Sequence, residues 1–114
     1  MSSNAVFFGW NRSTAGREKL SNEHFADFLG FLGKLQSQGT ITGFEPVFLA
    51  PHGGELNGFF LIRGEPSKLS VLLDSDEWLE HTTRALMHLD NSGYVRAYVG
   101  DAVQTVMNKW QKYL

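Results

Sequence analysis

The amino-acid sequence predicts an α+β domain in which a four-stranded antiparallel sheet carries helices on one face. Two strand-like apolar runs, 40–50 and 56–63, flank a Pro-His-Gly-Gly turn and lie too close together to form anything but a hairpin. Apolar residues at helical spacing precede and follow this pair. Short segments near the two ends of the chain supply the other two strands.

The first part of the chain is expected to form a strand and then a long helix. Residues 5–10 are apolar and rich in aromatic side chains, which is typical of a strand, and the polar segment 11–16 is interpreted as its exit loop. Between residues 17 and 38 apolar side chains recur at helical spacing. Gly39 follows at the position where a left-handed C-terminal cap is favoured.

The second part is expected to form two consecutive helices, a strand and a final helix. Pro66 suits the first turn of a short helix, and a longer helix begins after it with Asp74 as N-cap and Glu77 at the capping-box position. Residues 94–99 form the fourth strand. Asp101 is the expected cap of a C-terminal helix that carries an apolar stripe.

The order strand, helix, strand, strand, helix, strand is the ferredoxin-like βαββαβ arrangement, extended here by the C-terminal helix. Such a sheet has helices on one face, and its second face must be solvated or covered. A chain of 114 residues usually builds one core, so we expect a single domain over 1–114.

Alternation along each strand assigns its side chains to the two faces of the sheet. If Ala50 pairs with Leu56, one face of the hairpin is apolar and the other is mixed. The apolar face takes Phe44, Pro46, Phe48, Gly58, Phe60 and Ile62. The mixed face takes Glu45, Val47, Leu49, Asn57, Phe59, Leu61 and Arg63. In the last strand we expect Val95, Ala97 and Val99 to face the helices, and Tyr94, Arg96 and Tyr98 to face the other side.

The mixed face carries more apolar area than a soluble monomer usually leaves bare. An identical chain packed across a two-fold axis is the simplest cover, and it would make the protein a homodimer through the open sheet face. The two sheets would enclose a space, as in a dimeric α+β barrel. Polar side chains lining that space need partners, and Glu45 with Arg96 is the expected ion pair.

Composition and charge argue against several classes of function. The formal net charge is -2, with ten basic and twelve acidic side chains spread along the chain, so neither nucleic acid nor a membrane surface is an expected partner. The sequence shows no apolar stretch of the roughly 20 residues that a membrane helix needs. Cysteine is absent, which removes disulfides and thiolate chemistry, and a cytoplasmic location is the expectation.

Several segments together resemble a group of small uncharacterised bacterial proteins, and the resemblance covers most of the chain. They are Glu45-Pro46-Val47, Pro51-His52-Gly53-Gly54, Leu56-Asn57-Gly58-Phe59 and Ile62-Arg63-Gly64, with Asn11-Arg12 and Gly16-Arg17-Glu18 upstream. The resemblance implies the dimeric, ferredoxin-like α+β barrel and no assigned activity. The wider superfamily includes cofactor-independent monooxygenases, muconolactone isomerases, haem-degrading enzymes and YCII-like proteins, but none of their motifs can be placed on this chain.

Two residues are candidate catalytic groups. His52 in the hairpin turn could act as a base near the mouth of the enclosed space, although an exposed turn residue is the alternative. Glu45 could be a buried base or the counter-ion of Arg96. The other histidines, 24, 81 and 88, lie on helical segments without a ligand spacing, so neither a metal site nor a cofactor is expected.

The best candidate for ligand binding is the polar side of the last strand, because alternate residues of a strand project in parallel. An arginine between two tyrosines could hold an anionic or aromatic ligand, although a dimer interface is enriched in the same residues. The candidate ligand-binding residues are Tyr94, Arg96, Tyr98, Glu45, Asn57 and Trp10, the last of which could also be part of the core.

Three functional hypotheses remain open. The first is a homodimeric barrel of unknown role that binds a small organic ligand between its sheets. The second is a cofactor-independent enzyme, monooxygenase-like or isomerase-like, that acts on a small aromatic or carbonyl metabolite with His52 or Glu45 as base. The third is a regulatory or interaction module, for which exposed apolar residues on the C-terminal helix beyond those needed by the dimer would be the sign.

Overall fold

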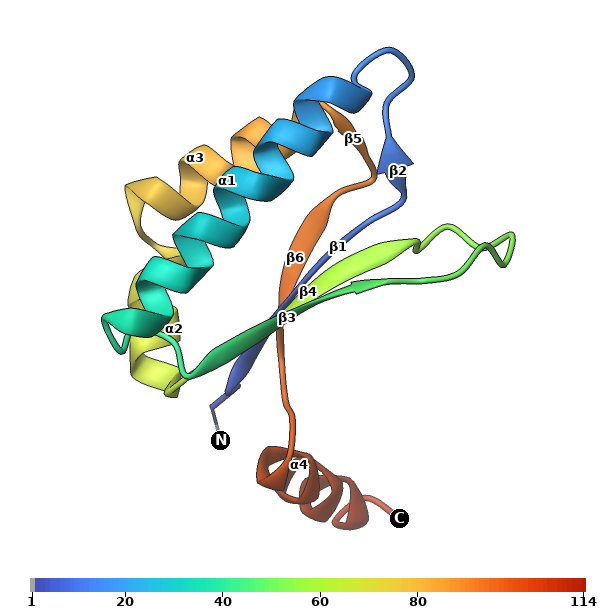
Figure 1. Ribbon diagram of the computed structural model, residues 1–114. Coiled ribbons are helices and arrows are strands. Elements are labelled where there is room, and N and C mark those ends of the chain that lie inside the picture. Colours follow the sequence, from blue (N-terminus) through green and yellow to red (C-terminus); the bar gives the residue numbers. More distant parts are fainter. Residues whose placement is uncertain (1) are drawn as a thin grey trace.

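The computed structural model describes residues 2–114 and shows a four-stranded sheet with three helices against one face (Figure 1). The strands of this sheet are β1 (Ala5–Trp10), β3 (Gly43–Phe48), β4 (Gly58–Arg63) and β6 (Gly93–Ala97). The helices are α1 (Glu18–Ser37), α2 (Pro66–Leu73), α3 (Asp76–Leu86) and α4 (Asp101–Gln111). Two short strands, β2 (Arg12–Ser13) and β5 (Leu89–Asp90), pair with each other beside the main sheet.

The sheet order is β3-β4-β1-β6 and every pairing is antiparallel. With α1 between β1 and β3, and α2 and α3 between β4 and β6, this is the ferredoxin-like arrangement, so the predicted fold class is confirmed. Within residues 2–114, no helix has the length and apolar character needed to cross a bilayer.

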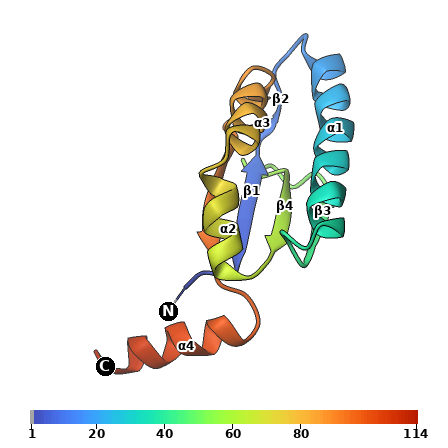
Figure 2. The same ribbon diagram turned by 90° about the vertical axis from the view of Figure 1, so that its left-hand side faces the viewer.

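The helix layer divides the inner face of the sheet into two halves. In Figure 2, α1 stands beside β3 and β4, while α2 and α3 stand over β1 and β6. The core between the layers is aromatic: Phe28 of α1 contacts Phe8 and Phe60 from the sheet and Trp78 from α3. Burial of each such side chain stabilises the fold by about 1.5–3 kcal/mol. The helices therefore pack on the face of the sheet that carries these aromatic side chains.

The predicted hairpin register is confirmed. Phe48 lies opposite Gly58 and Phe44 lies opposite Ile62, which is the register that pairing of Ala50 with Leu56 implies. The strands are shorter than expected, because the ladder ends at Phe48 and the chain from residue 49 to 57 forms the loop. The two faces of the hairpin are therefore composed as the sequence predicts.

The predicted facing of the last strand is wrong. Tyr94 pairs with Phe8 and Arg96 pairs with Val6, both of which are buried on the helix side, and directly opposed residues share a face. Val95, with 59% of its surface exposed, and Ala97 therefore point to the open side. The reason is that β6 is an edge strand, where long side chains reach the helix layer and still keep their polar ends near solvent.

The expected ion pair between Glu45 and Arg96 is also wrong. These residues lie on β3 and β6, the two opposite edges of the sheet, roughly 14 Å apart at the usual strand spacing. Glu45 instead pairs with Arg63, its diagonal neighbour on β4, at 2.9 Å. Arg96 donates a hydrogen bond from Nη1 to Ser70 Oγ of α2 at 3.1 Å.

The β2–β5 ladder was not predicted, since 11–16 was expected to be a loop. Its register pairs Arg12 with Asp90 and Ser13 with Leu89, and Thr14 Oγ1 donates to Asp90 Oδ1 at 2.7 Å. This ladder holds the end of α3 against the start of α1. It therefore brings together two segments about 70 residues apart in the sequence.

Helix α4 lies beyond one end of the sheet, apart from the other three helices (Figure 1). Its small Ala102 is buried, whereas Val103, Met107 and Trp110 are 43%, 43% and 66% exposed. These three side chains form an apolar stripe on α4, and no described residue covers it.

Candidate functional site

A cavity of about 400 Å³ lies between α1 and the inner face of the sheet. We call it the α1 pocket. Its apolar walls come from the sheet and from one face of α1, and they include Phe8, Trp10, Phe25, Phe28, Phe48 and Phe60. Its polar end is formed where α1 begins and α3 ends, by residues that include Ser13, Glu18, Ser21, His24 and His88. An apolar cavity with a few convergent polar groups is the usual form of a small-molecule site.

The aromatic walls follow from the strand register. Phe25 projects from α1 onto Phe48 and Phe60, with ring centroids 5.2 and 5.4 Å apart. Trp10 pairs across the ladder with Gly58, so its indole lies over bare backbone and reaches Phe60 at 5.6 Å between centroids. A Cβ on residue 58 would lie 2.5 Å from the Trp10 ring, so the indole keeps this position only with glycine there.

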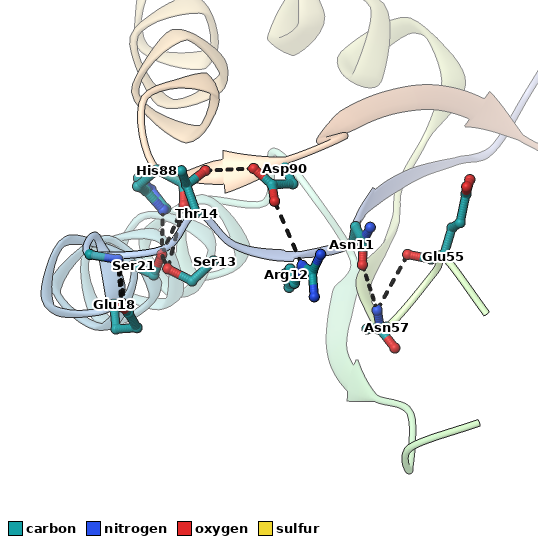
Figure 3. Close-up of polar contacts among 11 residues, drawn as sticks. Asn11, Arg12, Ser13, Thr14, Glu18, Ser21, Glu55, Asn57, His88 and Asp90 are labelled. Atoms are coloured by element: carbon teal, nitrogen blue, oxygen red, sulfur yellow. Dashed lines mark hydrogen bonds and ion pairs between the residues drawn. The ribbon is translucent and has the colours of Figure 1, made fainter. Parts of the chain in front are cut away.

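Three hydroxyl and imidazole groups meet at the polar end (Figure 3). Ser21 Oγ lies 2.7 Å from His88 Nδ1 and 2.6 Å from Ser13 Oγ. Ser21 belongs to the first turn of α1, and His88 follows α3 directly before β5. The β2–β5 ladder fixes this contact, because Thr14 N–H donates to the carbonyl oxygen of His88 at 2.8 Å.

The hydrogen bonds continue from His88 through two more histidines. His88 Nε2 lies 2.7 Å from His24 Nδ1, and His24 Nε2 lies 3.0 Å from His81 Nδ1. We call Ser21, His88, His24 and His81 the histidine chain. His24 and His88 are buried, whereas His81 of α3 is half-buried, so the chain leads from the pocket toward the surface.

Burial keeps the rings of this chain neutral near pH 7. Burial, with a contribution from the Arg84 guanidinium, lowers the pKa of His24 from 6.5 to about 4. Burial and Arg84 also lower the pKa values of His88 and His81. At His81 the carboxylates of Glu77, Asp27 and Glu80 act in the opposite direction. These carboxylates offset part of the lowering, so burial and Arg84 still keep the pKa of His81 below its usual value.

Neutral rings allow one consistent direction of donation along the whole chain. Ser13 can donate to Ser21, Ser21 to His88 Nδ1, His88 Nε2–H to His24 and His24 Nε2–H to His81. In this arrangement both nitrogens of His88 are occupied. The group that the chain presents to the pocket is therefore the Ser21 hydroxyl.

Of the residues predicted to form the ligand site, Trp10 lines the α1 pocket. Tyr94 packs its ring edge-on against Trp78, 5.2 Å between centroids, and Arg96 bonds Ser70 of α2. Tyr98 lies beyond the end of β6 and is 42% exposed. The structure therefore does not bring this predicted group to one cavity.

The remaining predicted residues make local contacts on the other side of the sheet or in the hairpin. Asn57 Nδ2 donates to Asn11 Oδ1 at 2.8 Å (Figure 3). His52 is exposed at the hairpin tip, where Nδ1 accepts from Gly54 N–H at 3.1 Å and Nε2 donates to the Leu56 carbonyl at 2.8 Å. Glu45 is engaged by Arg63.

The sequence interpretation missed Ser21, His24, His81 and His88 as a group. Two signals were present: His24 lies four residues before Phe28 on the apolar stripe of α1, and residues 81 and 88 are seven apart. Both spacings place residues on one helix face. The approach of α1 to α3 is a tertiary contact, however, and it joins positions 57 to 67 residues apart.

The outer side of the sheet, which we call the open sheet face, carries a second hollow. Phe7 and Phe59 pack there with ring centroids 4.9 Å apart, and the neighbouring positions are aliphatic or small. A shallow hollow of about 390 Å³ is lined by residues that include Phe7, Gly9, Leu56 and Val95. Asn91 and Ser92 add polar groups to its rim.

Comparison with known proteins supports the fold. No family model matches the chain, and no curated protein has a significantly similar sequence. The structure is similar to a dimeric protein of unknown function and ferredoxin-like fold from Bacteroides fragilis, with 8% identity, a TM-score of 0.57 and coverage of 83% of this chain and 95% of that one. It is also similar to SnoaB, a cofactor-independent oxygenase from Streptomyces nogalater, with 14% identity, a TM-score of 0.51 and coverage of 88% and 98%.

These likenesses concern the fold alone, because the sequence identities are low. They confirm the ferredoxin-like fold that the sequence resemblance implied.

Proposed function

We propose that this protein binds a small, neutral and largely apolar organic molecule in the α1 pocket. The observation that carries this proposal is the cavity of about 400 Å³ with aromatic walls and one polar end. Its volume lies within the range of small-molecule sites, about 300–1,000 Å³. The ligand would stack its apolar part between Trp10 and Phe25 and place a polar atom near Ser21.

The charge of the pocket favours a neutral ligand. In the described part of the chain, its lining includes one carboxylate, Glu18, and no lysine or arginine. The lining histidines, His24 and His88, are neutral near pH 7 because burial lowers their pKa values. An anionic ligand would lose hydration without gaining a cation, which is costly.

We also infer that the protein is a homodimer through the open sheet face. Phe7, Phe59 and Val95 lie on that side, together with the aliphatic Val47 and Leu61. The fold-related protein from Bacteroides fragilis is described as dimeric. A second copy would remove this apolar face from water.

Helix α4 extends the surface that the partner is proposed to cover. It follows β6 after residues 98–100, and its Met107 and Trp110 are exposed. We propose that the partner covers these side chains as well. A second copy of the chain explains both exposed areas with one partner, which makes a separate interaction module unnecessary.

The experiment compares two phenylalanine-to-alanine variants on opposite sides of the sheet. Phe25 is a wall of the α1 pocket and Phe59 belongs to the open sheet face, and both are half-buried. Binding of 1-naphthol is followed by calorimetry, and the oligomeric state by size exclusion with light scattering. Phe25→Ala should weaken binding about tenfold or more, as expected for losing 1.5–3 kcal/mol of apolar contact, and should leave the dimer intact.

Phe59→Ala should weaken the dimer and change 1-naphthol affinity less than about threefold, since the pocket walls are untouched. If Phe59→Ala alone impairs binding, the ligand lies between the two sheets and the α1 pocket is the wrong site. A wild-type protein that is monomeric at micromolar concentration would contradict the homodimer.

A further inference from the structure

We propose that Ser21 is the nucleophile of an acyl-transfer site in the α1 pocket, with His88 as its general base, and that small carboxylic esters are the substrate class. The inference rests on the proposed function, because the ester must bind in that pocket. His24 and His81 are positioning residues that act through His88.

The geometry is that of an activated serine. Ser21 Oγ lies 2.7 Å from His88 Nδ1, and the opposite nitrogen of His88 lies 2.7 Å from His24. A hydroxyl within hydrogen-bond reach of a base that a third group orients is the general signature of nucleophilic catalysis. Ser21 and His88 both line the cavity, so the oxygen and the bound molecule share one space.

The reaction balances without a cofactor. Ser21 Oγ would bond to the ester carbonyl carbon while His88 Nδ1 takes the hydroxyl proton. The tetrahedral intermediate would then expel the alkoxide, which takes that proton from His88 and leaves as the alcohol. Water, deprotonated by His88, would attack the acyl-serine, release the carboxylic acid and restore the Ser21 hydroxyl.

Two features of the site would stabilise the charges that form during this reaction. When His88 gains a proton, its Nε2–H can pass to His24 and the His24 Nε2–H to His81, which moves the charge to the half-buried end beside Glu77 and Asp27. Arg84 opposes this movement.

At the start of α1, Arg17 provides no side-chain cap, so the N–H groups of residues 18–20 keep their partial positive charge. That end of the helix would favour a carbonyl oxygen that becomes an oxyanion near Ser21, whereas the Glu18 carboxylate in the same turn would oppose it.

The first test is hydrolysis of 1-naphthyl acetate together with labelling by a fluorophosphonate, which phosphonylates an activated serine and releases fluoride. One label per chain is expected at Ser21. Ser21→Ala should abolish labelling and lower kcat/KM at least about 100-fold, while Ser37→Ala, on the last turn of the same helix, should change neither.

A second test uses the absence of cysteine from the chain. Ser21→Cys and Ser37→Cys each introduce a single thiol. The pH at which the rate of alkylation by iodoacetamide is half-maximal gives the pKa of that thiol, whether the thiol is exposed or buried. That pH should lie at least one unit lower for Ser21→Cys than for Ser37→Cys, because His88 takes the thiol proton. Adding His24→Phe should raise it again, which a purely structural role of His24 would not do.

The outcomes separate the two proposals. If 1-naphthol binds in the α1 pocket but no label forms, or hydrolysis persists in Ser21→Ala, or the two thiols titrate alike, the nucleophile is overturned and ligand binding stands. If 1-naphthol does not bind and 1-naphthyl acetate is not hydrolysed, both are overturned.

Discussion

Nδ1 of His24 lies 2.7 Å from Nε2 of His88, although 64 residues separate them in the sequence. The contact joins α1 to the segment that follows α3, and it lies under the polar end of the α1 pocket. Two buried imidazoles this close are compatible when at least one nitrogen of the contact is unprotonated. The charge state of this pair is therefore linked to the stability of the fold.

We expect the free energy of unfolding to fall between about pH 6.5 and pH 4. The pKa of His24 is about 4 in the folded chain against 6.5 as its usual value. Below pH 6.5 the unfolded chain therefore binds a proton that the folded chain does not, which lowers stability by up to about 3 kcal/mol at pH 4. Above pH 6.5 His24 is neutral in both states and contributes no slope.

Urea unfolding at several pH values measures this slope. The groups that act on His24 are Arg84, His88, His81 and Asp27. His24→Phe should remove about one proton of pH dependence from that window. If wild type and His24→Phe show the same pH dependence of the free energy of unfolding, the pKa of His24 is not lowered in the folded chain.

Gly58→Ala should destabilise the protein and deform the α1 pocket. The added Cβ would lie 2.5 Å from the Trp10 ring, so the indole must move, at a cost of about 1–3 kcal/mol. Gly30→Ala, on the exposed side of α1, meets no heavy atom of the described residues within 4 Å and should stabilise by about 0.5–1 kcal/mol. Thermal unfolding of both variants checks the opposite signs, and a neutral Gly58→Ala would contradict the Trp10 placement.

The facing of β6 can be tested with two adjacent positions. Tyr94→Ala should change the near-ultraviolet circular dichroism, because it removes the ring that packs on Trp78, and should cost about 1–2 kcal/mol. Val95→Ala should leave that spectrum unchanged and weaken self-association instead, since Val95 is on the open sheet face. If Val95→Ala changed the spectrum and Tyr94→Ala weakened self-association, Val95 and not Tyr94 would face the helices, as the sequence predicted.

The sequence predicted the order of the four main strands and the four helices, the hairpin register and the position of the Gly39 cap, where φ is +76°. These features depend on local spacing and turn chemistry, which a single sequence displays. The facing of β6 was wrong because alternation divides Tyr94 from Val95 without stating which side is inward. The pairing of Tyr94 with Phe8 decides which side of β6 faces the helices, and this pairing is a long-range contact that the local sequence does not show.

The candidate site was predicted less well than the fold. Trp10 was expected to line the space between two sheets and instead lines the α1 pocket on the helix side of the sheet. His52 and Glu45 are occupied by neighbours in the hairpin. The histidine chain could not be inferred, because Ser21 and His88 meet through the unpredicted β2–β5 ladder.

An NMR titration with 1-naphthol that follows the indole N–H signals of the three tryptophans tests ligand binding in the α1 pocket most directly. Trp10 lines the α1 pocket, Trp78 is buried in the core and Trp110 is exposed on α4. Ligand binding in the α1 pocket should give a saturable shift of the Trp10 signal, a small shift for Trp78 and none for Trp110. A Trp10 signal that stays in place while other signals shift at saturation would contradict ligand binding in the α1 pocket.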